Sequence, residues 1–254
     1  MSGEIHVSRP REAVVLLEID NPPSNALAEA LRRRLEVELD GVEADHSVRC
    51  VVLTGRGKGF SSGDDLREAA ARGDGARASL GQFGRMLDKV ESLRVPVIGA
   101  INGHAVGGGL ELALCCDIRL AAAGARFLAA GVNVGLMASV YRLPRLVGTA
   151  AASAMILTGS PIDAARALAI GLVSEVYAPE ALMGAALDLA QRIATRAPLS
   201  VEASKRMIRQ AFDLGPEAAR EAAGRELRLL AASNDHCEGV AAFVGRREPV
   251  FTRS

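Results

Sequence analysis

Apolar residues along the chain alternate between short runs and helical stripes. Leucines recur every fourth residue at Leu27, Leu31, Leu35 and Leu39, which predicts an amphipathic helix. The short runs have the length of buried strands and contain many β-branched residues. They lie at 14–19, 50–54, 95–101, 117–121 and 172–177. Strand-like runs that alternate with helical stretches favour an α/β organisation.

The remaining pattern predicts a basic surface, a candidate lid and a helical end. Arg32, Arg33 and Arg34 fall mostly off the leucine stripe, so we expect them to form a solvated face. Residues 68–77 have weak periodicity and two glycines, which indicates a mobile segment that is a candidate lid over a ligand. From Glu180 onward the pattern is almost wholly helical, and its breaks predict three or four helices.

Composition excludes some classes of partner. The chain of 254 residues can bury one sizeable domain, or a core with a helical appendage, and its 30 basic and 30 acidic residues cancel. Neither nucleic acid nor an anionic membrane is therefore an expected partner. The N-terminus lacks the apolar stretch of a signal peptide, and there is no apolar run of membrane-spanning length. We expect a cytoplasmic protein.

Cysteines and histidines give no sign of a metal site. Cys50, Cys115 and Cys116 lie in apolar stretches without metal-type spacing, so we interpret them as small buried hydrophobic residues without disulfides. His104 has no second ligand at a suitable spacing, and we interpret it as a structural histidine. Metal dependence is not expected.

Two glycine-bearing turns carry the candidate chemistry. They occupy 57–66, which contains Gly63, and 100–112, which contains Gly107, Gly108 and Gly109. Each follows an apolar strand-like run and leads toward a helix, so each presents backbone N–H groups. If the turns converge, one N–H from each can stabilise a negatively charged oxygen, as in an oxyanion hole. The alternative is that these glycines only permit tight turns or close packing.

These segments, together with 20–27 before them and 116–120 after them, resemble the crotonase family of enoyl-CoA hydratases and isomerases. The resemblance runs nearly end to end. It implies an α/β fold, a crotonase-like spiral of β-β-α repeats with a C-terminal helical region. Residues 1–195 would form the spiral core, and 196–254 the helical region that builds a homotrimer or a dimer of trimers. No internal sequence repeat reveals the spiral by itself.

The resemblance also implies a catalytic site. The backbone N–H groups of Asp64 and Gly108 would be the two oxyanion donors, and Glu111 the acid/base. We expect the Asp64 carboxylate to point away from the hole, where it would oppose negative charge. The second family carboxylate falls on Gly131, which cannot exchange protons, so ordinary hydration should be weak or use a substitute group such as Tyr141 or Asn133.

By the same resemblance, the segment 137–146 is shorter than the family segment and lacks its glycines, which indicates a reshaped acyl pocket around the loop 137–142. If this loop leaves room, a glutamate introduced at Gly131 should raise hydration. The substrate is expected to be an acyl-CoA thioester, with coenzyme A as part of the substrate and no further cofactor. Its expected binding residues are Lys58, Phe60, Ser62, Asp64, Asp65, Leu66, Arg67, Gly108, Gly131 and Tyr141.

Three classes of function remain open. The first is a lyase or isomerase of the enoyl-CoA hydratase type, acting in fatty acid metabolism. The second is a hydrolase, decarboxylase or dehalogenase that uses the same hole, and the third is a catalytically silent acyl-CoA-binding protein. Gly131 separates them, because hydration calls for two proton-handling groups, isomerisation for one and binding for none. Isomerases of the family generally keep the carboxylate at the other position, which weighs against that activity.

Overall fold

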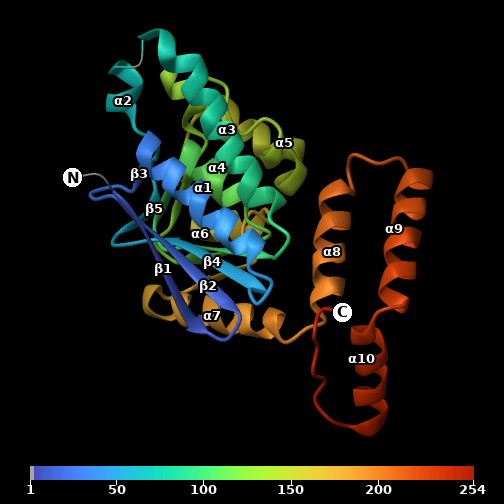
Figure 1. The fold of residues 1–254 in the computed structure, drawn as a ribbon. Helices are drawn as coiled ribbons and strands as arrows, with labels where there is room; N and C mark the ends of the chain where they lie inside the picture. Colours follow the sequence, from blue (N-terminus) through green and yellow to red (C-terminus); the bar gives the residue numbers. More distant parts are fainter. Residues whose placement is uncertain (1–2, 72) are drawn as a thin grey trace.

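The computed structural model describes residues 3–71 and 73–254. Figure 1 shows an α/β core from which three C-terminal helices extend. The six-stranded sheet has the order β1 (Glu4–Arg11), β2 (Val14–Asp20), β4 (Cys50–Gly55), β7 (Val97–Ile101), β9 (Ile118–Ala122), β12 (Glu175–Tyr177). The four-stranded sheet has the order β11 (Ile162–Asp163), β10 (Arg126–Leu128), β8 (His104–Val106), β5 (Gly59–Ser61). A third, two-stranded sheet pairs β3 (Ala26–Leu27) with β6 (Gly63–Asp64).

The helices surround these sheets and then continue beyond them. Those of the core are α1 (Glu29–Ala44), α2 (Leu66–Ala71), α3 (Ala76–Ser92), α4 (Gly108–Cys115), α5 (Arg142–Thr158), α6 (Ala164–Ala169) and α7 (Pro179–Ala194). Two short 3₁₀ helices are η1 (Gly73–Gly75) and η2 (Ala130–Val134). The C-terminal helices are α8 (Pro198–Gln210), α9 (Pro216–Ala231) and α10 (Asn234–Gly245). Within the described ranges, no helix has both the length and the apolar character needed to cross a membrane.

The chain winds between the two larger sheets. β4, β7 and β9 pair in parallel within the six-stranded sheet, whereas the strands that follow them, β5, β8 and β10, pair in parallel within the four-stranded sheet. A helical segment follows each such pair of strands. These repeated β-β-α units place the carboxyl ends of β5 and β8 side by side, which brings the two glycine turns together.

The six-stranded sheet is buried on both faces. Side chains along a strand point alternately to opposite faces. Accordingly, Val14 and Leu16 of β2 pack in one cluster with α7, while Leu17 belongs to the larger cluster on the other face. The small residues Ala186 and Ala190 are fully buried on α7, so this helix can lie close to the sheet.

The leucine stripe is confirmed on α1 except at Leu27, which lies in β3 before the helix begins, and the predicted basic face is wrong at one position. Leu31, Leu35 and Leu39 are buried. Arg32 is also fully buried, with a relative exposure of 0%, because the buried face of α1 extends past the stripe toward α3 and β6. Arg33 remains on the surface, as expected, in an ion pair with Glu29.

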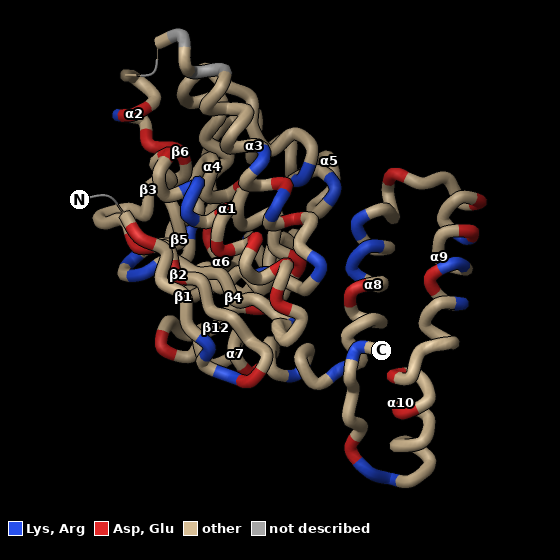
Figure 2. The backbone as a smooth tube through the Cα atoms, in the orientation of Figure 1, with Lys and Arg blue, Asp and Glu red and all other residues tan. Residues whose placement is uncertain are grey.

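Four helices follow residue 178, as the sequence pattern predicts. Buried ion pairs join α8 to the core, with Lys205 Nζ 2.8 Å from Asp117 and the Glu202 carboxylate 2.9 Å from Arg94. Basic and acidic residues are mixed along α1, α8 and α9 in Figure 2. The domain boundary predicted at 195/196 falls in the connection between α7, which ends at Ala194, and α8.

Two smaller expectations have different outcomes. Cys50, Cys115 and Cys116 are buried, and they and the exposed Cys237 are all free thiols, which confirms the interpretation of the first three. The candidate lid at 68–77 contains the end of α2, η1 and the start of α3, while Arg72 lies outside the described residues. Its role as a lid stays a prediction.

Candidate active site

The first glycine turn needs a glycine at its centre. Gly63 is the first residue of β6, two positions after the end of β5, and has φ of +83°, a backbone conformation that favours glycine. A Cβ at this position would lie 2.7 Å from the carbonyl oxygen of Val106 and 2.5 Å from the backbone nitrogen of Gly108. Any side chain there would push the two turns apart. The absence of a side chain at Gly63 therefore permits their convergence.

The second turn places Gly108 at the start of a helix. Gly107 is the N-cap of α4, and its own N–H donates to the carbonyl of Leu128 at 2.9 Å. Gly108 is thus the first residue whose N–H lies at the positive end of the helix. A Cβ built on Gly108 would lie 3.2 Å from the backbone nitrogen of Asp64. The structure thus brings the two predicted donor residues together.

Hydrogen bonds hold the first turn in this position. The Ser61 hydroxyl donates to the carbonyl of Asn25 at 2.7 Å and accepts from the Gly63 N–H at 3.1 Å. The Asn25 side chain in turn donates to the carbonyls of Arg56 and Gly59. His104 packs against Gly59 with its Nε2 3.2 Å from the carbonyl of Ser24, which is a structural position.

A cavity of about 460 Å³ lies in front of the two donor residues. Asp64 and Gly108 line it together with Glu111 of α4, whose side chain is only 13% exposed. The rest of the lining is mainly apolar and comes from α2, α3, the end of η2 and the segment that follows it. These residues are Leu66, Ala69, Leu80, Phe83, Leu87, Val134, Leu136, Met137, Val140 and Tyr141. The arrangement suits a ligand with one polar group near the hole and an apolar remainder.

Arg142 lies beside Glu111 at the wall of the cavity. Its guanidinium is 3.5 Å from the Glu111 carboxylate, 2.7 Å from Glu91 and 3.3 Å from Asp88. Burial opposes its charge, but Cys115 and the two glutamates outweigh this and hold the pKa of Arg142 above its usual value. Glu111 therefore has a permanent positive charge as its neighbour.

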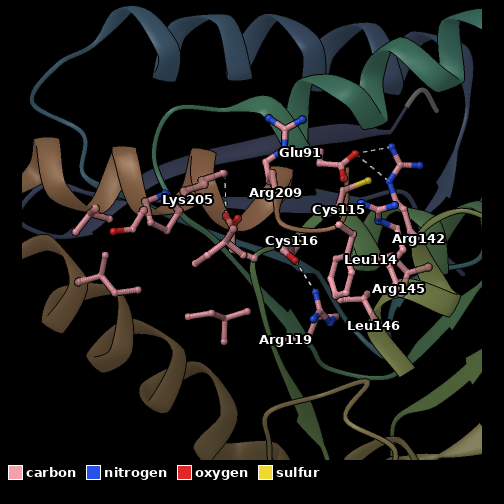
Figure 3. Close-up of a pocket in the computed structure, with 18 of the residues that line it drawn as sticks. Glu91, Leu114, Cys115, Cys116, Arg119, Arg142, Arg145, Leu146, Lys205 and Arg209 are labelled. Atoms are coloured by element: carbon pink, nitrogen blue, oxygen red, sulfur yellow. Dashed lines mark hydrogen bonds and ion pairs between the residues drawn. The ribbon is translucent and has the colours of Figure 1, made fainter. Parts of the chain in front are cut away.

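Arg142 also separates this cavity from a second one. The second cavity, of about 500 Å³, lies between the core and α8, and Tyr141 and Arg142 line both. Figure 3 shows this side, with Arg142 bonded to Glu91 and with Arg145 nearby. Arg145 of α5 lines the second cavity and stacks on the ring of Tyr141 at 4.7 Å. This contact holds Tyr141 in the wall between the two cavities.

The structure gathers seven of the predicted site residues around the first cavity. They are Ser62, Asp64, Leu66, Gly108, Glu111, Gly131 and Tyr141. Lys58, Phe60, Asp65 and Arg67 do not line it. The side chain of Phe60 is fully buried in the core, and the predicted contact of this residue with the substrate stays a prediction. The Asp65 carboxylate accepts the N–H groups of Arg67 and Glu68 at the start of α2, which is the role of a helix cap.

Gly131 has no space for a side chain. A Cβ there would lie 2.9 Å from both the Leu136 carbonyl oxygen and the Ala138 backbone nitrogen. The loop 137–142 therefore leaves no room for a glutamate introduced at Gly131, and the condition for a gain in hydration is not met. Of the two candidate substitutes, Tyr141 lines the cavity, whereas the Asn133 amide donates to the carbonyl of Gly159 away from it.

Sequence reasoning missed two arginines at this site. Arg32 bonds the carboxylate of Asp64 at 2.7 Å, which agrees with the expectation that this carboxylate points away from the hole. Arg142 has no signal in the sequence, because its three carboxylate partners lie 31 to 54 positions away. For Arg32, the one available signal was the expected position of a carboxylate at Asp64 beside the oxyanion hole, where a counter-charge would favour it.

Two converging backbone N–H groups, with a carboxylate across an apolar cavity, are the arrangement that the resemblance to the crotonase family implies. The enoyl-CoA hydratase/isomerase family model matches residues 9–254, and the chain belongs to this family, whose members are lyases and isomerases. It is 36% identical over 253 residues to the 2,3-dehydroadipyl-CoA hydratase of Escherichia coli, with 98% of each chain covered. It is also 34% identical over 260 residues to the carnitinyl-CoA dehydratase of Citrobacter koseri, with 99% of each covered.

Solved structures agree with this assignment. The crystal structure of an enoyl-CoA hydratase from Bacillus anthracis superposes with a TM-score of 0.96 at 31% identity, covering 98% of this chain and 99% of that one. The family and the crotonase fold expected from the sequence are confirmed. The names of these two relatives denote different acyl groups, so membership of the family alone does not identify the substrate.

Proposed function

We propose that this protein is an acyl-CoA enzyme that stabilises a thioester enolate with the N–H groups of Asp64 and Gly108 and uses Glu111 as its acid/base. One observation carries the proposal. The two backbone nitrogens converge at the cavity that Glu111 also lines. Preorganised donors of this kind contribute on the order of 3 kcal/mol each to a transition state in which negative charge develops.

Glu111 is the proposed acid/base because, of the two carboxylates that line the cavity, it has the longer ion pair, 3.5 Å to Arg142 against 2.7 Å between Asp64 and Arg32. Asp64 is paired with the buried Arg32, and Arg142 is shared among three carboxylates. In hydration, Glu111 takes a proton from water as the oxygen attacks Cβ, and the electron pair moves to the thioester oxygen as the enolate. Glu111 then returns the proton to Cα. One carboxylate can perform these two steps in sequence.

Isomerisation is a second candidate because Gly131 supplies no second carboxylate. In that reaction Glu111 would take a proton from Cα of a 3-enoyl thioester, which leaves a dienolate, and return it to Cγ. Both reactions place the negative charge of an enolate-type anion on the thioester oxygen, but hydration adds water at Cβ and returns the proton to Cα. Hydrolysis or decarboxylation of the thioester, and binding without turnover, are outcomes that the experiment below distinguishes.

The coenzyme A end of the substrate is proposed to lie near Lys58 and Arg67. Both flank the first glycine turn and are exposed, where a lysine or arginine can bind phosphate. Neither lines the cavity itself, so they would contact only the nucleotide end. Charge reversal at either residue should raise KM for acyl-CoA thioesters and leave kcat largely unchanged.

We further propose that the C-terminal helices assemble the chain into a homotrimer or a dimer of trimers. The support is the number of large apolar side chains exposed between the start of α8 and the end of α10, including Phe212 in the α8–α9 connection at 72%, Leu229 at 70% and Phe243 at 86%. An exposed apolar surface of this kind is typical of an interface. A monomer by light scattering at micromolar concentration would rule the assembly out.

The test of the proposed function has two parts. The protein is incubated with 2-enoyl-, 3-enoyl- and 3-hydroxyacyl-CoA thioesters, and the products are identified by mass. In parallel, a saturated acyl-CoA is held in D₂O, and deuterium at Cα is followed by mass spectrometry. Exchange at Cα together with hydration or isomerisation is expected. Release of free coenzyme A or CO₂ would point to hydrolysis or decarboxylation, and tight binding with neither exchange nor product would point to a binding protein.

A further inference from the structure

Arg32 is a buried cation that lies against the first donor segment. Its relative exposure is 0%, and Nη1 donates to Asp64 Oδ1 at 2.7 Å and to the carbonyl of Leu27 at 2.8 Å. Nε donates to Gln82 at 2.5 Å and Nη2 to Ser79 at 2.9 Å. All three guanidinium nitrogens have acceptors, as a buried charge requires. These acceptors come from β3, β6 and α3, so Arg32 joins three elements at this point.

The same guanidinium also reaches the second donor through an aromatic ring. It lies 5.2 Å from the ring centroid of Phe83, and the tip of this ring would be 2.4 Å from a Cβ built on Gly108. Phe83 thus packs beside one donor residue while Asp64 is the other. Arg32 therefore contacts the side chain of one donor residue, Asp64, and the ring of Phe83, which packs beside the other donor residue, Gly108.

A carboxylate at position 64 opposes formation of the thioester enolate. When the Cα–H bond breaks, the proton moves to Glu111 and the electron pair leaves a negative charge on the thioester oxygen. That oxygen would accept the N–H of Asp64, whose own carboxylate lies only a few bonds away. Two like charges about 5 Å apart at an effective dielectric constant of about 20 disfavour the enolate on the order of 10²-fold.

We propose that Arg32 is a positioning residue of the oxyanion hole. It turns the Asp64 carboxylate away from the hole and cancels its charge, and through Phe83 it fixes the wall beside Gly108. This inference rests on the proposed function, because it takes the Asp64 N–H as a donor. A purely structural role, joining α1 to α3, would affect stability but would leave the enolisation of a bound thioester unchanged.

The test measures enolate formation directly. Acetoacetyl-CoA has an acidic carbon between two carbonyl groups, and its enolate is detected by ultraviolet absorbance. The pH at which half of the protein-bound thioester is enolised reports the electrostatics of the hole without any turnover. Arg32→Met should raise this midpoint by about two pH units relative to the parent, which corresponds to the 10²-fold estimate above. Arg33→Met, one position along the same helix on its exposed face, is the matched control and should not shift it.

Asp64→Asn gives the opposite sign and does not depend on removing Arg32. It keeps the backbone N–H but leaves Arg32 as an uncancelled positive charge, so the midpoint should fall below that of the parent. Combining Asp64→Asn with Arg32→Met removes both charges and should reverse most of the shift that Arg32→Met causes, so that the midpoint returns toward that of the parent. Arg32→Lys, which keeps the charge, should remain within half a pH unit of the parent.

The outcomes separate the two proposals. If the parent does not lower the midpoint below that of free acetoacetyl-CoA, the oxyanion hole is wrong, and the role of Arg32 falls with it. If the parent lowers the midpoint but folded Arg32→Met and Asp64→Asn variants keep the parent value, only the role of Arg32 is overturned. Should Arg32→Met fail to fold, an unchanged midpoint in Asp64→Asn is sufficient to reject the inference.

Discussion

Replacing Glu111 by glutamine is the sharpest perturbation of the proposed chemistry. The amide has the shape of the carboxylate but cannot exchange protons at neutral pH. A positioned acid or base contributes about 10²- to 10⁴-fold to a rate. Because Glu111 is proposed to perform both proton transfers, we expect kcat to fall by roughly 10³-fold or more.

The structure predicts that the protein will tolerate this change. The carboxylate of Glu111 is 3.5 Å from Arg142, which keeps Glu91 at 2.7 Å and Asp88 at 3.3 Å when Glu111 loses its charge. No uncompensated buried cation results. We therefore expect the free energy of unfolding to change by about 1 kcal/mol or less, and thioester affinity to be roughly unchanged.

The assay compares kcat for the best thioester of the panel, the Kd for a saturated acyl-CoA by calorimetry, and the melting temperature. Glu217→Gln is the matched control, since Glu217 also lies in the first turn of a helix but is exposed on α9, outside the cavity. Its kcat should equal that of the parent. Undiminished turnover by Glu111→Gln would refute the reasoning and move catalysis to another group, with Tyr141 or Asp64 the first to examine.

Four further predictions follow from the geometry. Gly131→Ala should destabilise the protein by about 1–3 kcal/mol in denaturant titration, because its Cβ would lie 2.9 Å from backbone atoms. Gly131→Glu should give no gain in hydration, and a gain would show that the loop 137–142 moves. Gly108→Pro removes one N–H donor at the first residue of α4, a position that suits proline. The variant is made together with Phe83→Leu, which gives room for the proline ring. It should lower kcat at least about 10²-fold relative to Phe83→Leu alone. Iodoacetamide at pH 8 should modify only Cys237 in the native protein, as read by intact mass, since burial raises the pKa of the other three thiols, that of Cys50 to about 12. Burial raises the pKa of Glu202, but hydrogen bonds from two arginines outweigh this and lower the pKa below its usual 4.5. The ionised Glu202 therefore stabilises the fold above pH 4.5, and this contribution is lost as the pH falls below 4.5. The melting temperature should drop more steeply between pH 5 and 3 for the parent than for Glu202→Gln.

The sequence by itself determined the main elements of this protein and the two turns of its candidate site. The period of the leucines predicted α1, the apolar runs predicted β2, β4, β7 and β9, and the glycines predicted two turns that present backbone N–H groups. These features are local, because they depend on side-chain periodicity and on backbone conformations that glycine alone adopts readily. The spiral itself was reached only through the family resemblance, since no repeat in the sequence reveals it.

Only the tertiary structure decided the electrostatics of the site. Arg32 looked like part of a solvated run, yet it is buried against Asp64, 32 residues away. Arg142 joins Glu111 to Glu91 across three helices. A charged side chain can lie in the interior only when a partner meets it there, and the identity of that partner depends on how distant elements pack. Periodicity along one helix carries no information about the charges that a second helix presents to it.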